Sequence, residues 1–493
     1  MISLDGCVLK SNFVMMKQTS TVCKVALSNL LVLLFSISLA AVSPAEEAIE
    51  KGLELAVMGK PLPENFFDGV DRDLLEKSSE SDHRAQFLMA KVYEWGTSAE
   101  TADVKKAEQL YTRSAESGYA PAQSSLGDLW SNHKALGKTD EDALVWHKKA
   151  AAQKFAWSYA SLARIYGVGN RSVRQDKQAK DEWMQKALES DSPLAKGRVK
   201  AQLGYEYQYG SWKKDRDVKK AVELYNEAIE LGASKGAEYL GHVYFYGAEG
   251  IKKNQKKARA VYLQGAEMGN RMCMSQYGDA CLRGYGGPKA PKEAIKWYEK
   301  GANLGSSSSM LELSGIYLRG RLVPRNQEKA LLWAQRAVDA DYIRGYYQLG
   351  LYYQKGWAGL KKDLDKAIEL YQKAAMYKNA SGWVSYPPAV ESLAMVYLGR
   401  DGYKRDASKA LRWLNFSQSP ACKYELGCLY RDGEAVETDL EKAFALFKDA
   451  AKRGNKKAMV EVANAYREGH GVDVDQAEAK QWQDRADQNR SGR

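Results

Sequence analysis

Two stretches of the chain decide the fold, AEYLGHVYFYG at residues 237–247 and AVELYNEAIELG at residues 221–232. In the first stretch, leucine and glycine are followed at three-residue intervals by an aromatic residue and a second glycine. The segments 344–356 and 422–433 repeat this order. In the second stretch, small and apolar residues recur at the three- and four-residue spacing of a helix face. This self-similarity predicts an array of helical repeats.

The period of the array follows from one anchor position, the small residue directly after the leucine. It recurs eleven times at a mean spacing of about 37 residues, a period typical of helical repeats. The anchors are Ala90, Gly127, Ala163, Gly204, Gly241, Gly278, Ser314, Gly350, Ala394, Gly427 and Ala463. An alanine follows each anchor after 16 or 17 residues and begins the second motif. These alanines are Ala107, Ala143, Ala179, Ala221, Ala258, Ala294, Ala330, Ala367, Ala410, Ala443 and Ala479.

Residues at the motif boundaries predict where the helices begin and end. Glycine closes the first motif, as at Gly247 and Gly356, where a positive φ ends a helix at little cost. Asparagine or aspartate precedes the second motif and can cap its unpaired amides, as at Asn254, Asn326 and Asp439. Small anchors let the two helices of a repeat approach closely. We therefore interpret the 30 tyrosines first of all as packing residues.

These motifs resemble the Sel-1-like repeat family, which is related to the tetratricopeptide family. The pattern A-x-x-x-L-G-x-x-Y-x-x-G, followed by K-A-x-x-W-Y-x-K-A-A-x-x-G, is matched well at 237–269 and 345–375. The resemblance covers about residues 83–487 and implies an all-α fold, a right-handed α-solenoid of about eleven helix-turn-helix repeats. It also implies a role in protein–protein contacts. Residues 46–82 would form an N-terminal cap and 488–493 a short tail.

The N-terminus predicts export. Val25–Leu39 is apolar but too short to span a bilayer, and small residues with cleavage signals ending at Ala40 and Ala45 follow it. We interpret residues 1–45 as a secretory signal peptide, with Met16 as an alternative start. An uncleaved signal anchor is the other interpretation. The expected location is the periplasm or the extracellular space, with no stable membrane span after cleavage.

The positive net charge of the chain indicates which classes of partner it is expected to bind. The 493 residues carry a formal net charge of +11, which falls to +9 when residues 1–45 are removed. A basic exported protein meets acidic protein surfaces or anionic envelope polymers rather than nucleic acid. The alternative is that the excess lysine forms a solvated surface. With 45% hydrophobic and 27% charged residues, the chain is expected to fold rather than to be disordered.

The sequence offers little for catalysis, a metal or a cofactor. Its five histidines never fall at metal-ligand spacing, and the G-x-S-x-G match at 232–236 joins two predicted helices instead of a strand and a helix. Four cysteines beyond the leader are too far apart in pairs for disulfides, which predicts buried free thiols. They are Cys273, Cys281, Cys422 and Cys428. We expect a non-catalytic interaction scaffold; the alternative is a penicillin-binding or penicillin-hydrolysing enzyme, as the resemblance implies for a branch of the family with paired cysteines.

The first helices of tetratricopeptide-like repeats line the concave face, which predicts a candidate binding surface. The resemblance places positions −6, −3, +1 and +4 from each anchor on that face. In the early repeats these positions are Arg84, Lys91, Asp128 and Arg164. Later repeats supply an apolar strip with a basic rim, made of Phe245, Met272, Leu282, Leu311, Leu318, Tyr347, Leu351, Met395 and Tyr424, with Arg344 and Arg431. Such a strip is typical of a protein or peptide groove, although superhelical curvature could instead bury it.

The period breaks at three places. The distance from the second-motif alanine to the next anchor is 20 residues in most repeats, but 25 after Ala179, 27 after Ala367 and 17 after Ala410. Insertions in repeat arrays usually form loops, often on the binding side. The insertion within 376–390 carries Trp383, Tyr386 and a Pro-Pro pair. It is expected either to contact a partner or to fold back and fill a wedge between uneven repeats.

Overall fold

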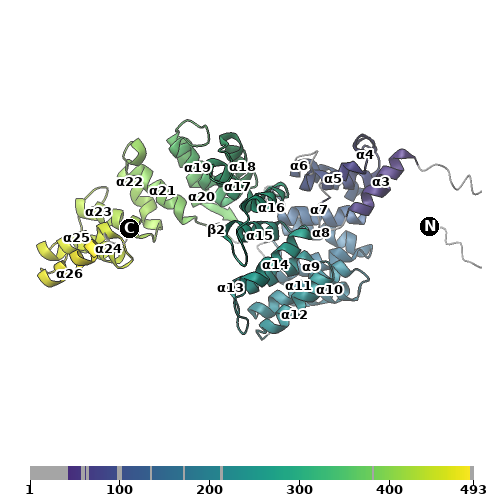
Figure 1. The fold of residues 1–493 in the computed structure, drawn as a ribbon, viewed down its shortest axis with the longest axis horizontal. Helices are drawn as coiled ribbons and strands as arrows, with labels where there is room; N and C mark the ends of the chain where they lie inside the picture. The colour runs from purple at the N-terminus through teal and green to yellow at the C-terminus, as the bar shows by residue number, and fades with distance from the viewer. Residues whose placement is uncertain are drawn as a thin grey trace, which may run out of the picture.

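The computed structural model describes residues 43–488, except 57–61, 63–65, 97–102, 134–135, 170–171, 211–214 and 380–381. Eleven consecutive helix pairs form an all-α solenoid, which confirms the predicted fold class and repeat number (Figure 1). The first helices of the pairs are α5 (His83–Trp95), α7 (Ala120–Asn132), α9 (Ala156–Val168), α11 (Pro193–Tyr209), α13 (Ser234–Tyr246), α15 (Arg271–Arg283), α17 (Ser307–Arg319), α19 (Ile343–Lys355), α21 (Pro387–Tyr397), α23 (Pro420–Asp432) and α25 (Lys456–Glu468).

The second helices run back along the first ones. They are α6 (Val104–Glu116), α8 (Asp140–Ala152), α10 (Lys177–Glu189), α12 (Val218–Glu230), α14 (Gln255–Glu267), α16 (Pro291–Asn303), α18 (Gln327–Asp339), α20 (Leu364–Ala375), α22 (Ala407–Phe416), α24 (Leu440–Lys452) and α26 (Gln476–Gln488). Their predicted caps are confirmed, since the Asn254, Asn326 and Asp439 side chains each accept a backbone N–H three residues on. Gly247 and Gly356 end α13 and α19 with positive φ.

The anchor glycines are required by close packing of the paired helices. A Cβ atom added to Gly350 would lie 2.6 Å from the Tyr371 ring of the second helix, and one on Gly278 would lie 2.7 Å from Tyr298. The repeat with a serine at the anchor position packs its two helices through hydrogen bonds instead. Ser314 donates a hydrogen bond to the backbone of α18 and lies 2.7 Å from the hydroxyl of Tyr352, which comes from the next repeat.

Each break in the period has its own structural result. The residues added after Ala179 lengthen α11 to 17 residues, so the expectation that insertions form loops is wrong here. The shortening after Ala410 leaves α22 with 10 residues. The insertion after Ala367 forms a small antiparallel hairpin of β1 (Tyr377–Asn379) and β2 (Gly382–Val384). The same connection type therefore absorbs extra residues either as helix or as hairpin.

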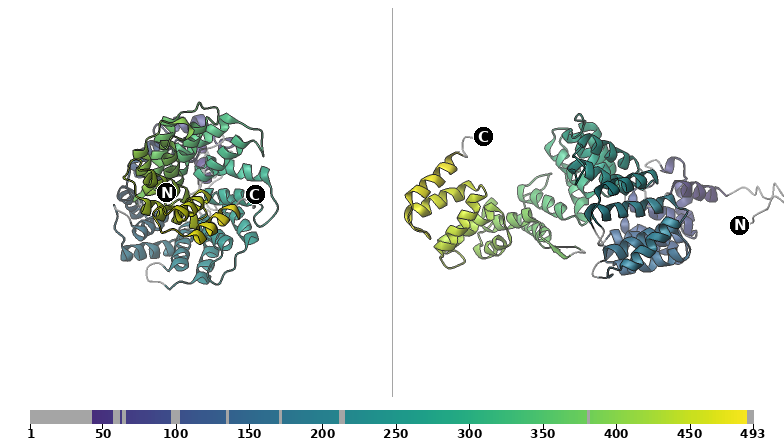
Figure 2. Two further views of the ribbon diagram at one scale, coloured as in Figure 1. Left: turned by 90° about the vertical axis from the view of Figure 1, so that its left-hand side faces the viewer. Right: turned by 90° about the horizontal axis from the view of Figure 1, so that it is seen from below.

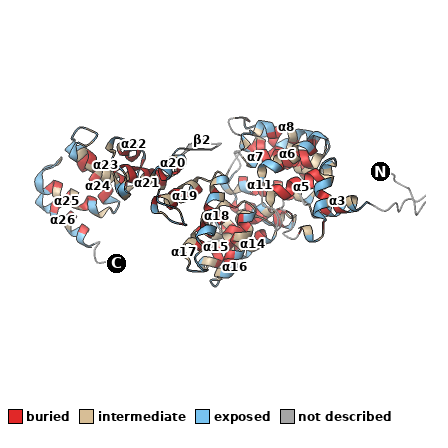
Figure 3. Cartoon of the chain, turned by 90° about the horizontal axis from the view of Figure 1, so that it is seen from above, coloured by how far each residue is buried: buried red, intermediate tan, exposed pale blue. Residues whose placement is uncertain are grey.

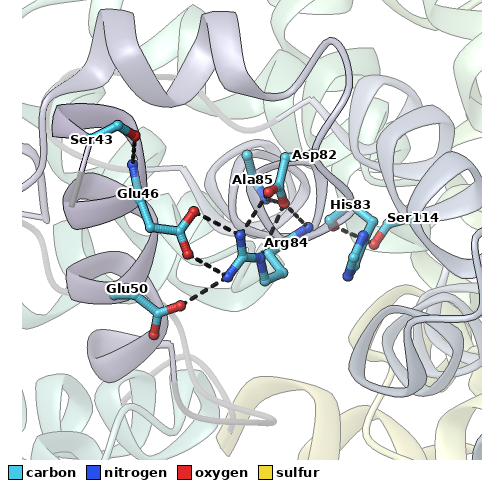
Figure 4. A network of polar contacts seen from close by, with 8 residues as sticks. All are labelled: Ser43, Glu46, Glu50, Asp82, His83, Arg84, Ala85 and Ser114. Atoms are coloured by element: carbon cyan, nitrogen blue, oxygen red, sulfur yellow. Dashed lines mark hydrogen bonds and ion pairs between the residues drawn. The ribbon is translucent and has the colours of Figure 1, made fainter. Parts of the chain in front are cut away.

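The N-terminal end of the solenoid is covered by α3 (Pro44–Leu55), a short 3₁₀ turn at Phe66–Asp68, and α4 (Arg72–Ser78). A buried apolar cluster joins these elements to α5. At its edge, the guanidinium of Arg84 donates to the carboxylates of Glu46 and Glu50 at 2.9 Å (Figure 4). Arg84 is therefore held by α3, and the prediction that it lies on an open concave face is wrong.

Two parts of the solenoid differ in shape. Helices α5–α14, here called the N-terminal turn, curl tightly beside one another, whereas helices α21–α26, the C-terminal arm, extend away from them (Figures 1 and 2). Buried residues run along the helix contacts in both parts (Figure 3). Within the described part of the chain, no helix has the length and apolar character needed to cross a membrane. The predicted leader falls almost entirely on residues 1–42, outside the described residues.

Candidate binding surfaces

A cavity of about 910 Å³ lies within the N-terminal turn. Side chains from α5, α7, α9, α11 and α13 line it, together with the residue that caps α15. Its charged lining residues include Lys91, Glu94, Asp128, Arg164, Arg198, Glu206 and Lys235. Its aromatic lining residues are Trp95, Trp157, Tyr205 and Tyr239. The wall thus combines charged groups of both signs with large rings, which is a composition suited to binding rather than to packing alone.

Asp128 is an acidic residue of the cavity that accepts hydrogen bonds from several neighbours. Its carboxylate accepts hydrogen bonds from the Trp157 indole at 2.7 Å and the Ser161 hydroxyl at 3.0 Å, and Arg198 lies at 3.5 Å. The Nε2 atom of the buried His147 lies 3.6 Å from the Asp128 carboxylate. Burial alone would raise the pKa of Asp128, but Arg198, His147 and the indole N–H lower it to about 2. Asp128 is therefore ionised, and its acceptor positions are largely filled.

Arg164 has a different environment. Its Nη2 atom is buried and has no hydrogen-bond partner. Burial lowers the pKa of its guanidinium and Arg198 adds to this effect, whereas Asp128 and Asp140 oppose it. An arginine remains charged under these conditions because its intrinsic pKa exceeds about 12. The cavity wall therefore contains a cationic donor atom that the protein itself does not satisfy.

Other cations near the cavity are paired within the fold. The ammonium group of Lys180 lies 2.9 Å from the Glu206 carboxylate, and that of Lys235 lies 2.7 Å from Glu238. Arg198 also stacks over the Trp157 ring, 4.4 Å from its centroid. Burial lowers the pKa of Lys91 to about 8, with an opposing effect from Glu94. These pairs hold the inner helices together in a region where the apolar clusters are small.

The predicted apolar strip is only half-exposed. Phe245, Leu282 and Leu318 are partly buried against the central apolar cluster, as are Leu351 and Met395 against the next one. Leu311 is 7% exposed and belongs to the core, which corrects its assignment to an open face. Met272 and Tyr424 are partly buried, the latter against the last cluster. The strip is thus a series of half-buried side chains and not a continuous open surface.

Two strip residues and the insertion come together at one point. The rings of Tyr347 and Tyr386 meet edge to face with centroids 5.3 Å apart. Arg344 is exposed, and contacts with the hydroxyls of Tyr342 and Tyr386 help to raise its pKa against the opposing effect of burial. The other rim residue, Arg431, pairs with Asp432 and with Glu461. Half of the predicted basic rim is therefore neutralised within the fold.

The base of the insertion folds back onto the solenoid. The Tyr377 hydroxyl donates to the backbone carbonyl of Asp341 at 2.8 Å, and the Tyr386 N–H donates to the Ala374 carbonyl. Of the two interpretations of the insertion, these contacts favour the wedge for its base. Residues 380–381 and the side chain of Trp383 lie outside the described residues.

The cavity includes residues that the sequence interpretation did not select. Trp157, Arg198 and Lys235 each lie six positions before an anchor, where the resemblance had placed concave-face residues. The spacing of these residues from the anchors therefore already indicated that they lie on the binding face. Only the folded chain, however, shows that residues from five consecutive repeats meet around one space.

The cysteines and the metal-binding residue types of the described chain lie apart from one another or are buried. All four cysteines are free; three are buried and Cys428 is half-buried, which corrects the expectation that all four are buried. Burial raises the pKa of Cys422 and of Cys428 to about 11. Among the described residues, no three His, Cys, Asp or Glu side chains come together where they could hold a metal ion.

The family model of the Sel1 repeat matches the sequence of this chain in nine segments, which together cover more than half of it. They are residues 83–119, 200–232, 234–270, 272–306, 307–342, 343–376, 387–416, 420–455 and 456–486. The chain belongs to the Sel1 repeat family. Sel1 repeat proteins are generally protein-interaction scaffolds. The family model does not match residues 120–199, which lie in the N-terminal turn.

The chain is also similar to solved and curated proteins. A protective antigen of uropathogenic Escherichia coli with an SLR fold is 26% identical, covers 86% of this chain and 88% of its own, and has a TM-score of 0.53. A Sel1 repeat protein from Oxalobacter formigenes is 25% identical over 63% of this chain and 88% of its own, with a TM-score of 0.48. Chitin synthase regulatory factor 2 from Schizosaccharomyces pombe is 28% identical over 145 residues. That match covers 27% of each protein.

Proposed function

We propose that this protein is an exported, non-catalytic adaptor that holds a protein or peptide partner on the first helices of its repeats. The observation that carries the proposal is the meeting of Tyr347 and Tyr386 beside the exposed Arg344. Aromatic and arginine side chains together are typical of the energetic centre of an interface. The name of the fission yeast relative, a regulatory factor, suits a binding role.

The proposed partner surface is the half-exposed strip together with the insertion. Its members are Phe245, Met272, Leu282, Leu318, Arg344, Tyr347, Leu351, Trp383, Tyr386, Met395, Tyr424 and Arg431. A half-buried side chain is held in one conformation by its neighbours, so that binding costs little additional side-chain entropy. An anionic envelope polymer is the second kind of partner that the basic chain would suit.

Capture from a native envelope extract, followed by mass spectrometry, tests the adaptor role. Replacing Tyr347 and Phe245 by alanine should weaken capture of the partner with little loss of helicity. Leu332→Ala is the matched control, because Leu332 is 48% exposed on a second helix outside the strip. Unchanged capture, or a large fall in melting temperature without a specific loss of capture, would contradict the assignment of these residues to the interface.

The enzyme alternative has weaker support. It depends on paired cysteines, whereas the four cysteines of the described chain are free thiols. We therefore expect a fluorescent penicillin to leave the purified protein unlabelled. Labelling that survives denaturation would favour the enzyme over the adaptor.

Export is proposed from the leader, and the cap of α3 supports the proposal of the earlier cleavage site. The Ser43 hydroxyl accepts the Glu46 N–H and thereby caps α3, which begins at Pro44. Cleavage after Ala45 would remove both residues, whereas cleavage after Ala40 would keep them. We expect the mature chain to begin upstream of Ser43, which N-terminal sequencing of the exported protein can test.

A further inference from the structure

We propose that the cavity of the N-terminal turn is a second binding site, and that it takes a carboxylate group of a peptide at Arg164. The site is separate from the strip of the later repeats, so it does not depend on the adaptor surface proposed above. Its starting point is the Nη2 atom of Arg164, which is buried without a hydrogen-bond partner. An unsatisfied buried donor is destabilising, and more so when it carries charge.

The carboxylates closest to Arg164 in the cavity wall are already engaged by other residues. Asp128 already receives hydrogen bonds from Trp157 and Ser161 and lies beside Arg198. The carboxylate of Glu206, which also lines the cavity, is paired with Lys180. A leucine or methionine at position 164 would avoid the cost of the buried charge, so the fold by itself gives no reason for an arginine. An acceptor supplied by a ligand does give one.

The surrounding charges select a carboxylate over a phosphate. The lining has four cationic and three anionic side chains, a formal excess of one positive charge, which one carboxylate balances and a doubly charged group exceeds. The cations are Lys91, Arg164, Arg198 and Lys235, and the anions are Glu94, Asp128 and Glu206. The guanidinium of Arg164, whose Nη2 atom has no partner in the fold, can bind one carboxylate through charge-assisted hydrogen bonds. The site is therefore built for a single negative charge.

The rest of the wall is suited to a peptide. Tyr205 is 42% exposed, and its ring lies 5.3 Å from that of Tyr239 and 4.6 Å from that of Tyr209. Of these rings, Tyr205 and Tyr239 line the cavity and offer it an aromatic surface. The amides of Asn132 and Gln202 also line it, and an amide side chain can both donate to and accept from a peptide backbone. A volume of about 910 Å³ lies at the upper end of compact ligand sites, which leaves room for several residues.

The carboxylate could come from an aspartate or glutamate side chain or from a peptide C-terminus, and labelled peptides can distinguish the two. The first probe is a pentapeptide with glutamate between two tyrosines, acetylated and amidated at its ends. The second has glutamine in place of glutamate, the third is the glutamine peptide with a free C-terminus, and the fourth has phosphoserine at the centre. Fluorescence anisotropy with the full chain gives the four affinities.

We expect the first or the third probe to bind at least tenfold more tightly than the second, and this ratio to disappear in Arg164→Gln. Arg485→Gln is the matched control, because it removes a guanidinium from α26, a helix that does not line the cavity. It should keep the ratio. If Arg164→Gln fails to fold, Tyr205→Ala provides the second test: it should weaken all tyrosine-flanked probes and preserve the ratio. Equal affinities for all four probes, tightest binding of the phosphoserine peptide, or a ratio that survives Arg164→Gln would each overturn the proposal.

Discussion

The N-terminal turn and the C-terminal arm are built from the same repeat but have different interiors. The turn buries Lys91, Lys180 and Glu206, and its second repeat also buries His147 completely. In the described part of the arm, Ser417 is the one polar residue in the buried class. Because both parts share the anchors and the capping residues, the difference comes from the other positions of both helices in a repeat. Lys91 and Glu206 lie on first helices and line the cavity of the turn, whereas His147 and Lys180 lie on second helices behind it.

The largest expected effect comes from breaking the ion pair within the turn. Glu206→Gln removes the buried carboxylate that lies 2.9 Å from the ammonium group of Lys180, which has no exposed surface and keeps only the more exposed Asp181 at 3.3 Å. We expect a loss of about 3–5 kcal/mol in the free energy of unfolding, measured by denaturant titration. The matched change in the arm, Glu434→Gln, breaks the exposed pair with Arg405 and should lose less than about 1 kcal/mol. Equal losses would remove the distinction between the two interiors.

Acid should weaken the turn more than the arm. Burial lowers the pKa of His133 and of His147 to about 4, from an unfolded value near 6.5. The unfolded state therefore takes up protons first, and stability falls as pH decreases from about 6.5 to 4, by about 2 kcal/mol per histidine at pH 5. Hydrogen exchange at pH 7 and pH 5, corrected for intrinsic rates, should show the loss in α7 and α8.

Two glutamine variants sharpen this prediction. His147→Gln cannot take up the proton and should remove part of the acid sensitivity. His470→Gln, on an exposed loop of the arm, should change nothing. An acid-sensitive arm, or a turn that is indifferent to pH, would show that the histidines are not the cause.

The anchor glycines should behave alike in both regions. A Cβ on Gly204 in the turn would lie 2.6 Å from the Tyr225 ring, and one on Gly427 in the arm would lie 2.6 Å from Phe447. Gly204→Ala and Gly427→Ala should therefore each lose about 1–3 kcal/mol of stability through overpacking. Thermal unfolding followed by circular dichroism measures both. A large effect in one region alone would mean that the repeat packing itself differs.

The smallest expected effect comes from a single hydroxyl. Tyr262 in the turn is buried and its hydroxyl has no hydrogen-bond partner, whereas the equivalent Tyr225 hydroxyl bonds to Gln208 at 2.7 Å. Tyr262→Phe introduces the residue type that the arm has at Phe447 and should be neutral or slightly stabilising. Tyr225→Phe should lose about 1 kcal/mol. A destabilised Tyr262→Phe would indicate a partner for this hydroxyl, such as a bound water.

The sequence predicted the features that depend on local spacing. The eleven helix pairs, the caps at Asn254, Asn326 and Asp439, and the glycine ends follow from periodicity and turn chemistry. The sequence could not predict how far the array curls, because small rotations between repeats accumulate over many residues. For this reason the pairing of Arg84 with α3, the burial of Leu311 and the cavity around Arg164 became visible only in the folded chain.

The central claim is that the cavity of the turn binds a peptide carboxylate and that the arm does not bind this ligand. Hydrogen exchange with and without the glutamate-centred peptide tests this claim most directly. We expect added protection in α7, α9 and α11, which carry Asp128, Arg164 and Arg198, and unchanged exchange in α21–α26. Protection in the arm alone, or saturating binding without protection in α9, would contradict it.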